Sequence, residues 1–167
     1  MSHPILIRPA ATPADFDGIA ALLARMRAWD AEMTAATGGG DVDLAALYEE
    51  SDAQGVQATF TAPGAGMILA DRAGAVLGCI GFAPLEGGAA EVCKVFVDDG
   101  ARGLGLARRM MARVLSDMAA AGHSRAVLET ATFMTEAIAL YRAHGFAPSL
   151  PFRPPFNHQS LFFSRDL

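Results

Sequence analysis

The sequence predicts an α/β (α+β mixed) fold in which a mixed, largely antiparallel central sheet is flanked by helices. Three strand-like runs follow one another through the middle of the chain and are separated by short glycine-containing turns, which predicts an antiparallel meander. Amphipathic helical segments precede and follow these runs. The predicted order is βααβββαβαβ. A length of 167 residues with 52% apolar residues fits a single domain, residues 1–167.

The N-terminal part predicts a short strand and a long helix. Residues 5–8 have the pattern of a strand, and Thr12 and Pro13 then supply an N-cap and a first-turn proline. Apolar residues recur at three- and four-residue spacing after this start, so the helix is expected to bury one face until about Thr34. Glycines at 38–40 end the helical pattern.

The next part predicts one more helix and the meander. A short acidic helix is expected over residues 41–50. The polar stretch that continues to Pro63 has little periodicity, which is typical of a loop. The three strands of the meander are expected at residues 67–71, 76–83 and 90–97.

The C-terminal part predicts two more helices and two more strands. A single apolar stripe runs through residues 104–121 and predicts an amphipathic helix that ends at Gly122. A strand over residues 126–130, a helix over 135–144 and a last strand over 160–164 complete the predicted fold.

Charge, cysteines and histidines limit the classes of protein that fit. A formal net charge of −5 argues against a nucleic-acid partner, which favours a basic face. No leader and no run of about 18 apolar residues is found, so we expect a cytoplasmic protein with no membrane partner. Cys79 and Cys93 lie in apolar runs and are expected to be reduced core thiols. The four histidines have no metal-ligand spacing, so no metal is predicted.

The stretch from Val95 to Ala107 has the pattern of an anion site. An apolar strand runs into a loop of small residues, and this loop opens a helix whose first N–H groups can bind a phosphate. A dinucleotide-binding G-x-G-x-x-G pattern would need glycine where Arg108 stands, and no Gly-Lys-Ser/Thr completes a Walker A pattern. A glycine turn that only connects strand and helix is the structural alternative.

Three segments resemble the GCN5-related N-acetyltransferase (GNAT) superfamily. Residues 102–107, Arg-Gly-Leu-Gly-Leu-Ala, match its Arg/Gln-x-x-Gly-x-Gly/Ala signature. Residues 91–97 resemble the family's fourth strand, and residues 137–146, which end in Tyr-Arg-Ala-His-Gly-Phe, resemble its later helix. The segments follow the family's order and spacing, and the chain looks most like a small, stand-alone bacterial member.

The resemblance implies a binding site for acetyl-CoA as a co-substrate. Backbone N–H groups of the signature would hold the pyrophosphate, two arginines would add charge, and the fourth strand would pair with the pantetheine arm. The implied binding residues are Val95, Phe96, Val97, Arg102, Gly103, Leu104, Gly105, Leu106, Ala107 and Arg108. Many members carry an asparagine after the fifth strand, whereas residues 130–134 of this chain are Thr-Ala-Thr-Phe-Met.

The resemblance also implies direct acetyl transfer to an amine without an acyl-enzyme. An ammonium must lose a proton before it attacks, and Glu91 is the first candidate for the base, ahead of Glu129 and Glu32. A solvated carboxylate at the strand end is the alternative for Glu91. Tyr141 stands where the family places the phenol that protonates the departing thiolate, and an ordinary core tyrosine is the alternative.

The acceptor pocket is expected between the first two helices and the tail. Its candidate residues are Trp29, Tyr48, Phe152, Arg153 and Phe156. A primary amine of a small molecule is favoured as the acceptor over a protein N-terminus or a lysine. A non-catalytic module that binds acetyl-CoA as a sensor is the competing class, and a homodimer is kept as an open alternative for the assembly.

Overall fold

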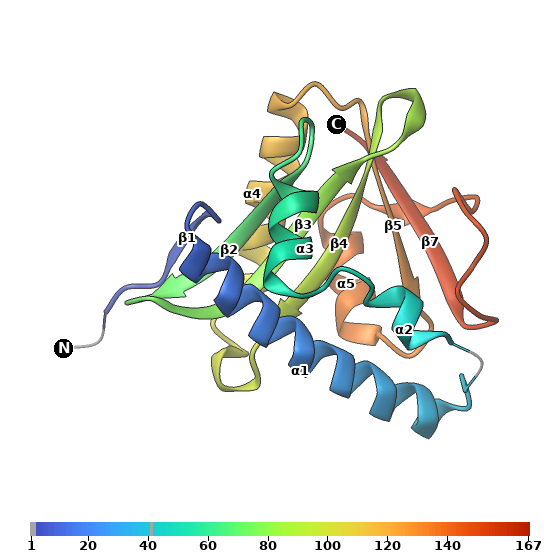
Figure 1. Cartoon of the computed structure of the whole chain (residues 1–167). Coiled ribbons are helices and arrows are strands. Elements are labelled where there is room, and N and C mark those ends of the chain that lie inside the picture. The colour runs from blue at the N-terminus through green and yellow to red at the C-terminus, as the bar shows by residue number, and fades with distance from the viewer. Residues whose placement is uncertain (1–2, 41) are drawn as a thin grey trace.

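The computed structural model describes residues 3–40 and 42–167 (Figure 1). Its strands are β1 (Leu6–Pro9), β2 (Gly66–Arg72), β3 (Ala75–Pro84), β4 (Ala89–Val97), β5 (Arg125–Ala131), β6 (Ala147–Pro148) and β7 (Ser160–Asp166). Its helices are α1 (Pro13–Thr37), α2 (Leu44–Leu47), α3 (Ala53–Phe60), α4 (Leu106–Ala120) and α5 (Thr135–Ala143). Short 3-10 turns lie at Glu86–Gly88 and Asp99–Ala101.

The strands form one sheet in the order β1-β2-β3-β4-β5-β7-β6. Neighbouring strands are antiparallel except β4 and β5, which are parallel. A parallel pair needs a crossover connection, and α4 lies in the connection between these two strands. The predicted mixed, largely antiparallel sheet and the meander β2–β3–β4 are therefore confirmed.

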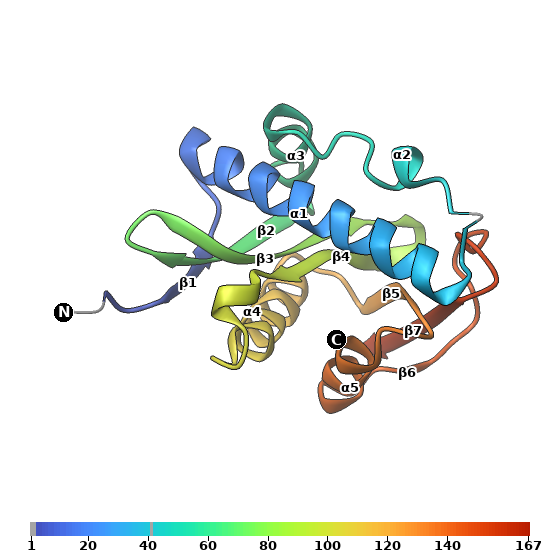
Figure 2. The same cartoon turned by 90° about the horizontal axis from the view of Figure 1, so that it is seen from below.

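The sheet separates two apolar cores, because successive side chains of a strand point to opposite faces. Met67 and Leu69 of β2 pack with residues of α1 and α3. Ile68 and Ala70 pack with residues of α4 and α5. Figure 2 shows the resulting layers, with α1 and α3 on one face of the sheet and α4 and α5 on the other. Helices thus cover both faces of the sheet.

The first long helix begins as the sequence predicts. The Thr12 hydroxyl accepts a hydrogen bond from the Asp15 N–H at 3.2 Å, and the Asp15 carboxylate accepts one from the Thr12 N–H at 3.0 Å. Arg8 of β1 bonds to Asp15 at 2.7 Å and holds the pKa of this carboxyl well below its usual range. The helix continues past its expected end to Thr37, where Gly38 caps it with a φ of +79°.

Three segments differ from the sequence prediction. The acidic stretch forms only the one-turn helix α2, and Asp41, where the prediction began, lies outside the described residues. The stretch expected to be a loop contains α3, which begins where the Asp52 side chain accepts a hydrogen bond from the Gly55 N–H. This helix buries Val56 and Phe60 alone, which is too little to create a clear period in the sequence. The two-residue strand β6 was also not predicted.

Candidate active site

Strands β4 and β5 diverge in the middle of the sheet. Their ladder joins Ala89–Glu91 to Arg125–Val127 and extends no further. Beyond Glu91, β3 is the only strand in the described part of the chain that pairs with β4. The other edge of β4 therefore carries unpaired backbone groups. Residues 95–97, where the family resemblance implies pairing with a pantetheine arm, lie on this open edge. An extended ligand can therefore add to β4 there as a further strand.

A β-bulge at Lys94 lies within the diverging part of β4. The register shifts between the pairs Cys79–Phe96 and Gly81–Cys93, so that two residues of β4 oppose one of β3. Lys94 has a φ of +56°, and its carbonyl accepts a hydrogen bond from the Cys79 thiol at 3.3 Å. The bulge re-aims the residues that follow it along the open edge.

The loop after β4 has the geometry of an anion-binding cradle. Gly103 and Gly105 have φ values of +78° and +70°, and a Cβ at either position would meet no atom within 4 Å. Gly105 is the N-cap of α4. In the described part of the chain, the backbone N–H groups of residues 103–108 have no hydrogen-bond partner. These groups and the dipole of α4 suit the oxygens of a phosphate.

The side chains of this loop differ in exposure. Leu106 is buried and anchors the start of α4 in the core, whereas Leu104 is 49% exposed. Arg102 pairs with Asp99 at 2.9 Å, and both side chains are largely in solvent. Arg108 is exposed and has no ion pair within the described ranges. Both arginines remain accessible to a bound anion, although exposed charges of this kind contribute little each.

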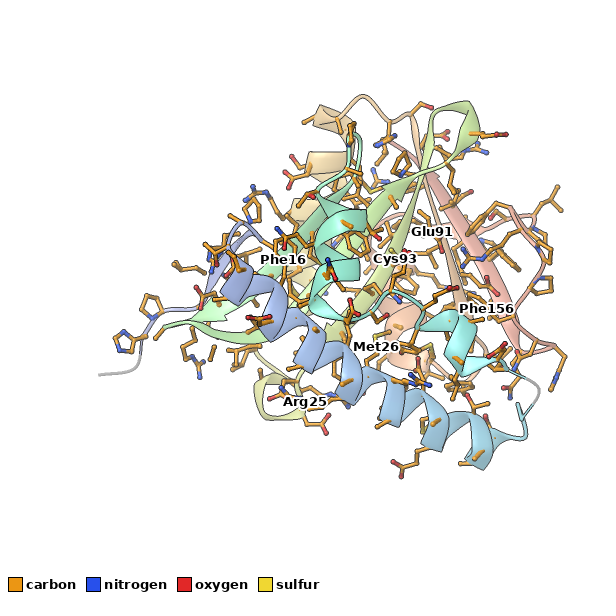
Figure 3. All side chains as sticks on the ribbon, in the orientation of Figure 1. Phe16, Arg25, Met26, Glu91, Cys93 and Phe156 are labelled. Atoms are coloured by element: carbon orange, nitrogen blue, oxygen red, sulfur yellow. The ribbon has the colours of Figure 1, made fainter. Side chains whose placement is uncertain are left out.

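A cavity of about 360 Å³ lies beside the divergence of β4 and β5. Its walls come from α1, α2, β4, the turn after β5 and the loop before β7. Figure 3 labels four of the lining residues, namely Met26, Glu91, Cys93 and Phe156. A cavity of this size, with apolar walls and a few polar groups, suits a small molecule.

Glu91, Glu129 and Arg153 form an ion-pair cluster in this cavity. One nitrogen of the Arg153 guanidinium donates a hydrogen bond to one carboxylate oxygen of Glu91 at 2.7 Å, and a second nitrogen forms an ion pair with the other oxygen at 2.7 Å. Its Nε donates to Glu129 at 2.9 Å, and the second Glu129 oxygen accepts from the Phe156 N–H at 2.8 Å. The Glu91 side chain is 15% exposed and that of Glu129 is 1% exposed. Glu91 therefore faces the cavity as one member of an ion-pair cluster.

A second polar cluster lines the same cavity. The Tyr48 hydroxyl donates to the Asp30 carboxylate, and Lys94 Nζ lies 4.8 Å from the centre of the Tyr48 ring. Lys94 Nζ also donates to the Leu47 carbonyl at 3.3 Å and to the Ser51 hydroxyl at 3.2 Å. Burial raises the pKa of Asp30 and of Tyr48 and lowers the pKa of Lys94.

Sequence reasoning missed Asp30 and Lys94. Asp30 follows Met26 by one turn on the buried face of α1, so a charged residue within the apolar stripe was the available signal. Lys94 is the one lysine in the sequence, and it interrupts an apolar strand. Asp30 and Lys94 are charged residues within otherwise apolar segments. Charged residues at such buried positions often have a functional role.

Tyr141 belongs to α5, and its side chain lies in the core between this helix and the sheet. It is 6% exposed, and its ring packs edge-on against Phe146 with 6.1 Å between centroids. Its hydroxyl has no hydrogen-bond partner among the residues that the structure describes, and burial raises its pKa. Tyr141 is not on the walls of the cavity that holds Glu91, so the structure does not bring the two expected catalytic residues into one pocket.

Three of the five expected acceptor-pocket residues line the cavity, namely Tyr48, Arg153 and Phe156. The other two, Trp29 and Phe152, do not line it. The Trp29 ring packs against Phe133 with 6.4 Å between centroids, and the Phe152 ring packs against Phe162 at 5.4 Å. Glu32 is exposed on α1 and does not line the cavity, which weakens it as a candidate base.

Cys79 and Cys93 are free thiols, as predicted. Cys79 is buried, whereas Cys93 is half-buried and lines the cavity. Burial raises the pKa of each thiol to about 12, so both stay protonated and are poor nucleophiles near neutral pH. Where the family has its asparagine, the end of β5 contributes Thr130 and the turn after it contributes Met134 to the cavity wall.

Two general features of the chain bear on its partners. Within residues 3–40 and 42–167, no helix combines the length and the apolar character that a bilayer span requires. In the same ranges, no group of three or more His, Cys, Asp or Glu side chains is arranged so that it could bind a metal ion.

Comparisons with known proteins agree with the resemblance seen in the sequence. The model of the acetyltransferase (GNAT) family matches residues 23–146. The IAA acetyltransferase of Azospirillum brasilense is 41% identical over 97 residues, which are 58% of this chain and 63% of that protein. Two further curated relatives match over 54% and 53% of their lengths. The matched region is thus less than two thirds of each relative.

Solved structures share the fold over nearly the whole chain. An acetyltransferase from Streptococcus agalactiae has a TM-score of 0.75 at 17% identity, and the match covers 98% of each chain. The ribosomal-protein-alanine N-acetyltransferase from Brucella melitensis has a TM-score of 0.70 at 23% identity, and the match covers 97% of this chain and 99% of that one. The likeness therefore includes β1 and the tail, where the sequence resemblance is loose.

Proposed function

This chain belongs to the GNAT acetyltransferase family, and from that premise we propose that it transfers an acetyl group from acetyl-CoA to a primary amine of a small molecule. One observation supports the proposal most. The open edge of β4 continues into the glycine cradle and lies beside the cavity. A donor bound along this edge would meet an acceptor bound in the cavity.

The donor side of the proposal rests on backbone groups. The free N–H groups of residues 103–108 would hold the pyrophosphate, and the absence of Cβ atoms at Gly103 and Gly105 leaves room for it. The edge of β4 at residues 95–97 would hold the pantetheine arm by strand pairing. Acetyl-CoA supplies an activated acetyl thioester when it is bound.

Glu91 is the proposed acceptor of the proton that the amine must lose. An alkylammonium with a pKa near that of lysine, about 10.4, is protonated at neutral pH and cannot attack. One Glu91 oxygen accepts a hydrogen bond from Arg153 and the other pairs with a second guanidinium nitrogen, and a carboxylate offers about four acceptor sites in all. Glu91 therefore retains the capacity to take a proton in the cavity, directly or through water.

Tyr141 is the proposed donor of the proton that the departing thiolate needs. Because burial raises its pKa and no described residue bonds to its hydroxyl, the phenol carries its proton at neutral pH. Val95 and Val97 of the open edge pack against the same core cluster as Tyr141. This shared packing supports a position of the Tyr141 hydroxyl near acetyl-CoA bound along β4, on the opposite side of that molecule from the acceptor cavity.

Positioning of the two reactants is expected to supply most of the rate enhancement, since well-oriented neighbours can contribute about 7 kcal/mol or more. The cavity volume of about 360 Å³ favours a small amine over a protein N-terminus or a lysine. A cytoplasmic location is part of the proposal and is supported by the two free thiols. The single domain and the homodimer stay predictions from the sequence.

The test is the release of coenzyme A from acetyl-CoA over a panel of small primary amines and peptides with a free N-terminus or lysine. We expect release with small amines, and Glu91→Gln should lower kcat at least about tenfold without changing acetyl-CoA affinity. Glu86→Gln, at the exposed turn before β4, is the matched control. Acetyl-CoA binding without release for any acceptor would overturn the proposal in favour of a sensor.

A further inference from the structure

The loop before β7 places a cation between carboxylates of the two diverging strands. Arg153 comes from this loop, Glu91 from β4 and Glu129 from β5. The β4–β5 ladder ends at Glu91, so the three side chains bridge the two strands where their hydrogen bonds stop. The guanidinium thus occupies one end of the cavity beside the expected donor strand.

Two aromatic rings also lie against this guanidinium. The Arg153 guanidinium carbon lies 4.9 Å from the centre of the Phe152 ring and 4.7 Å from that of Phe156. Carboxylates at the sides and aromatic faces are the chemistry with which proteins recognise organic cations. We call the four residues Glu91, Glu129, Phe152 and Phe156 the cation cage. Its present occupant is a side chain of the protein itself.

The cation cage is firmly built. The Glu129 side chain is 1% exposed, and the backbone N–H of Phe156 fixes its second oxygen. Burial by itself would lower the pKa of Arg153, but hydrogen bonds with Glu91 and Glu129 outweigh this effect and raise it. The guanidinium therefore stays charged, and its removal would leave the buried Glu129 carboxylate without its cation, which is costly.

Charge in the cavity is balanced for one further cation. The two carboxylates of the cage and the Arg153 guanidinium leave one net negative charge. Lys94 and Asp30 line the same cavity, and burial disfavours the charged form of each, so the pair adds no net charge whether both are charged or both are neutral. Glu49 and Glu50 lie exposed at the rim, where solvent and salt screen them. A single ammonium can be balanced in the cavity, but a second one finds no further unpaired buried carboxylate among the described residues of its walls.

We propose that Arg153 determines acceptor specificity, because it fills the cation cage and thereby selects monoamines with an apolar body over diamines and polyamines. The inference rests on the proposed function in taking the acceptor amine as the ligand of the cavity. The apolar body has its own support, since Met26, Phe133 and Met134 line the cavity. Such walls favour an alkyl or aryl amine.

The experiment measures amine binding to the full chain saturated with coenzyme A, which cannot transfer an acetyl group. Calorimetry compares pentylamine with cadaverine, and butylamine with putrescine, so that each pair differs by one ammonium. We expect the wild type to bind each monoamine about tenfold more tightly than its diamine. Arg153→Met removes the guanidinium, leaves two unpaired carboxylates and should reverse the preference by about tenfold in favour of the diamine.

Charge-matched variants separate this effect from a structural one. Glu129→Gln with Arg153→Met restores one net negative charge and should restore the wild-type preference, and Arg153→Lys, which keeps the charge, should retain it. Arg125→Met, which removes an exposed arginine paired with Asp166, is the control and should change nothing. If Arg153→Met does not fold, Glu129→Gln alone decides, because it leaves no net charge in the cage and should weaken pentylamine binding about tenfold.

Several results would overturn the inference. A wild-type preference for diamines, an unchanged ratio in Arg153→Met, or the absence of binding for every amine would each do so. Failure of the proposed function gives a different result, in which amines bind with the expected selectivity but acetyl-CoA and amine release no coenzyme A.

Discussion

The donor side and the acceptor side of the site are built in different ways. On the donor side, residues 95–108 supply an open strand edge, a glycine cradle and a helix start in one continuous segment, and the groups that would bind are backbone N–H and C=O. On the acceptor side, the cavity collects side chains from α1, α2, β4, β5 and the loop before β7. The donor side therefore depends on local conformation, and the acceptor side depends on how distant elements meet.

This contrast teaches where each kind of specificity can change. A site made of backbone groups tolerates most side-chain substitutions but fails where a glycine conformation is lost. A site made of side chains can be given a different ligand by one substitution, as proposed for Arg153. Variants that affect one side and leave the other intact are therefore the sharpest tests.

The largest effect is expected from Gly105→Val on the donor side. The substitution places a β-branched side chain at a φ of +70°, in the space that a phosphate would occupy. Acetyl-CoA affinity should fall at least about 1,000-fold, to below detection by calorimetry, because both the cradle and the helix N-terminus are lost.

The matched control for this variant is Gly74→Val at the β2–β3 turn. Gly74 has a φ of +87°, and a Cβ there would also meet no atom within 4 Å, so the backbone strain is comparable. We expect a similar loss of thermal stability with unchanged acetyl-CoA affinity. Retained affinity in Gly105→Val, at a protein concentration where it is folded, would refute the cradle.

A smaller effect is expected from Tyr141→Phe, in the core on the donor side. The hydroxyl has no partner among the described residues, so its removal should change stability little. As the proposed proton donor it should nevertheless matter for turnover, and we expect kcat to fall about 100-fold with acetyl-CoA affinity unchanged. Steady-state kinetics with direct binding measurements checks this, and an unchanged kcat with chemistry rate-limiting would leave Tyr141 as an ordinary core residue.

The smallest effect is expected from Asp30→Asn on the acceptor side. This substitution should change the thermal stability of the protein by an amount that depends on pH. Burial raises the pKa of Asp30 in the folded state, although the hydrogen bond from Tyr48 opposes this. A carboxyl with a raised folded pKa stabilises the fold below its unfolded value of about 3.9, and this contribution is lost as the pH rises through the folded pKa. The ionised carboxylate is therefore unfavourable at neutral pH.

Asparagine keeps the hydrogen-bond acceptor for Tyr48 and removes the charge. Asp30→Asn should therefore raise Tm by about 2–4 °C at pH 7.5, which corresponds to roughly 1 kcal/mol for a chain of this size, and the gain should shrink at pH 5. Thermal unfolding at the two pH values measures it. Asp17→Asn, an exposed change on the same helix, serves as control, and a drop in the Tm of Asp30→Asn at pH 7.5 would contradict the expected direction.

Individual elements show how far the sequence could predict the fold. Helix α4 buries a stripe that includes Met110, Met111 and Val114, so its period was visible and its position was predicted closely. Helix α3 buries Val56 and Phe60 alone, and its helical conformation depends on packing against α1, so it was not found. Local periodicity predicts an element only when enough of its residues are buried.

The candidate site shows the same division. The cradle could be predicted because Gly103 and Gly105 mark positive φ in the sequence itself. Arg153 was expected in the acceptor pocket, but its pairing with Glu91 and Glu129 joins three segments that are far apart in the chain. No short pattern in the sequence records which distant carboxylate an arginine will meet.

The sequence by itself determined the order of strands and helices, the glycine loop and the family resemblance, because these follow from residue conformational preferences and short-range spacing. The tertiary structure alone decided that β4 and β5 separate after Glu91, that the cavity opens beside this separation, and that Arg153 closes one end of it. The physical reason is that backbone conformation is encoded locally, whereas the contacts of a charged side chain are set by the packing of elements that the chain brings together only when it folds.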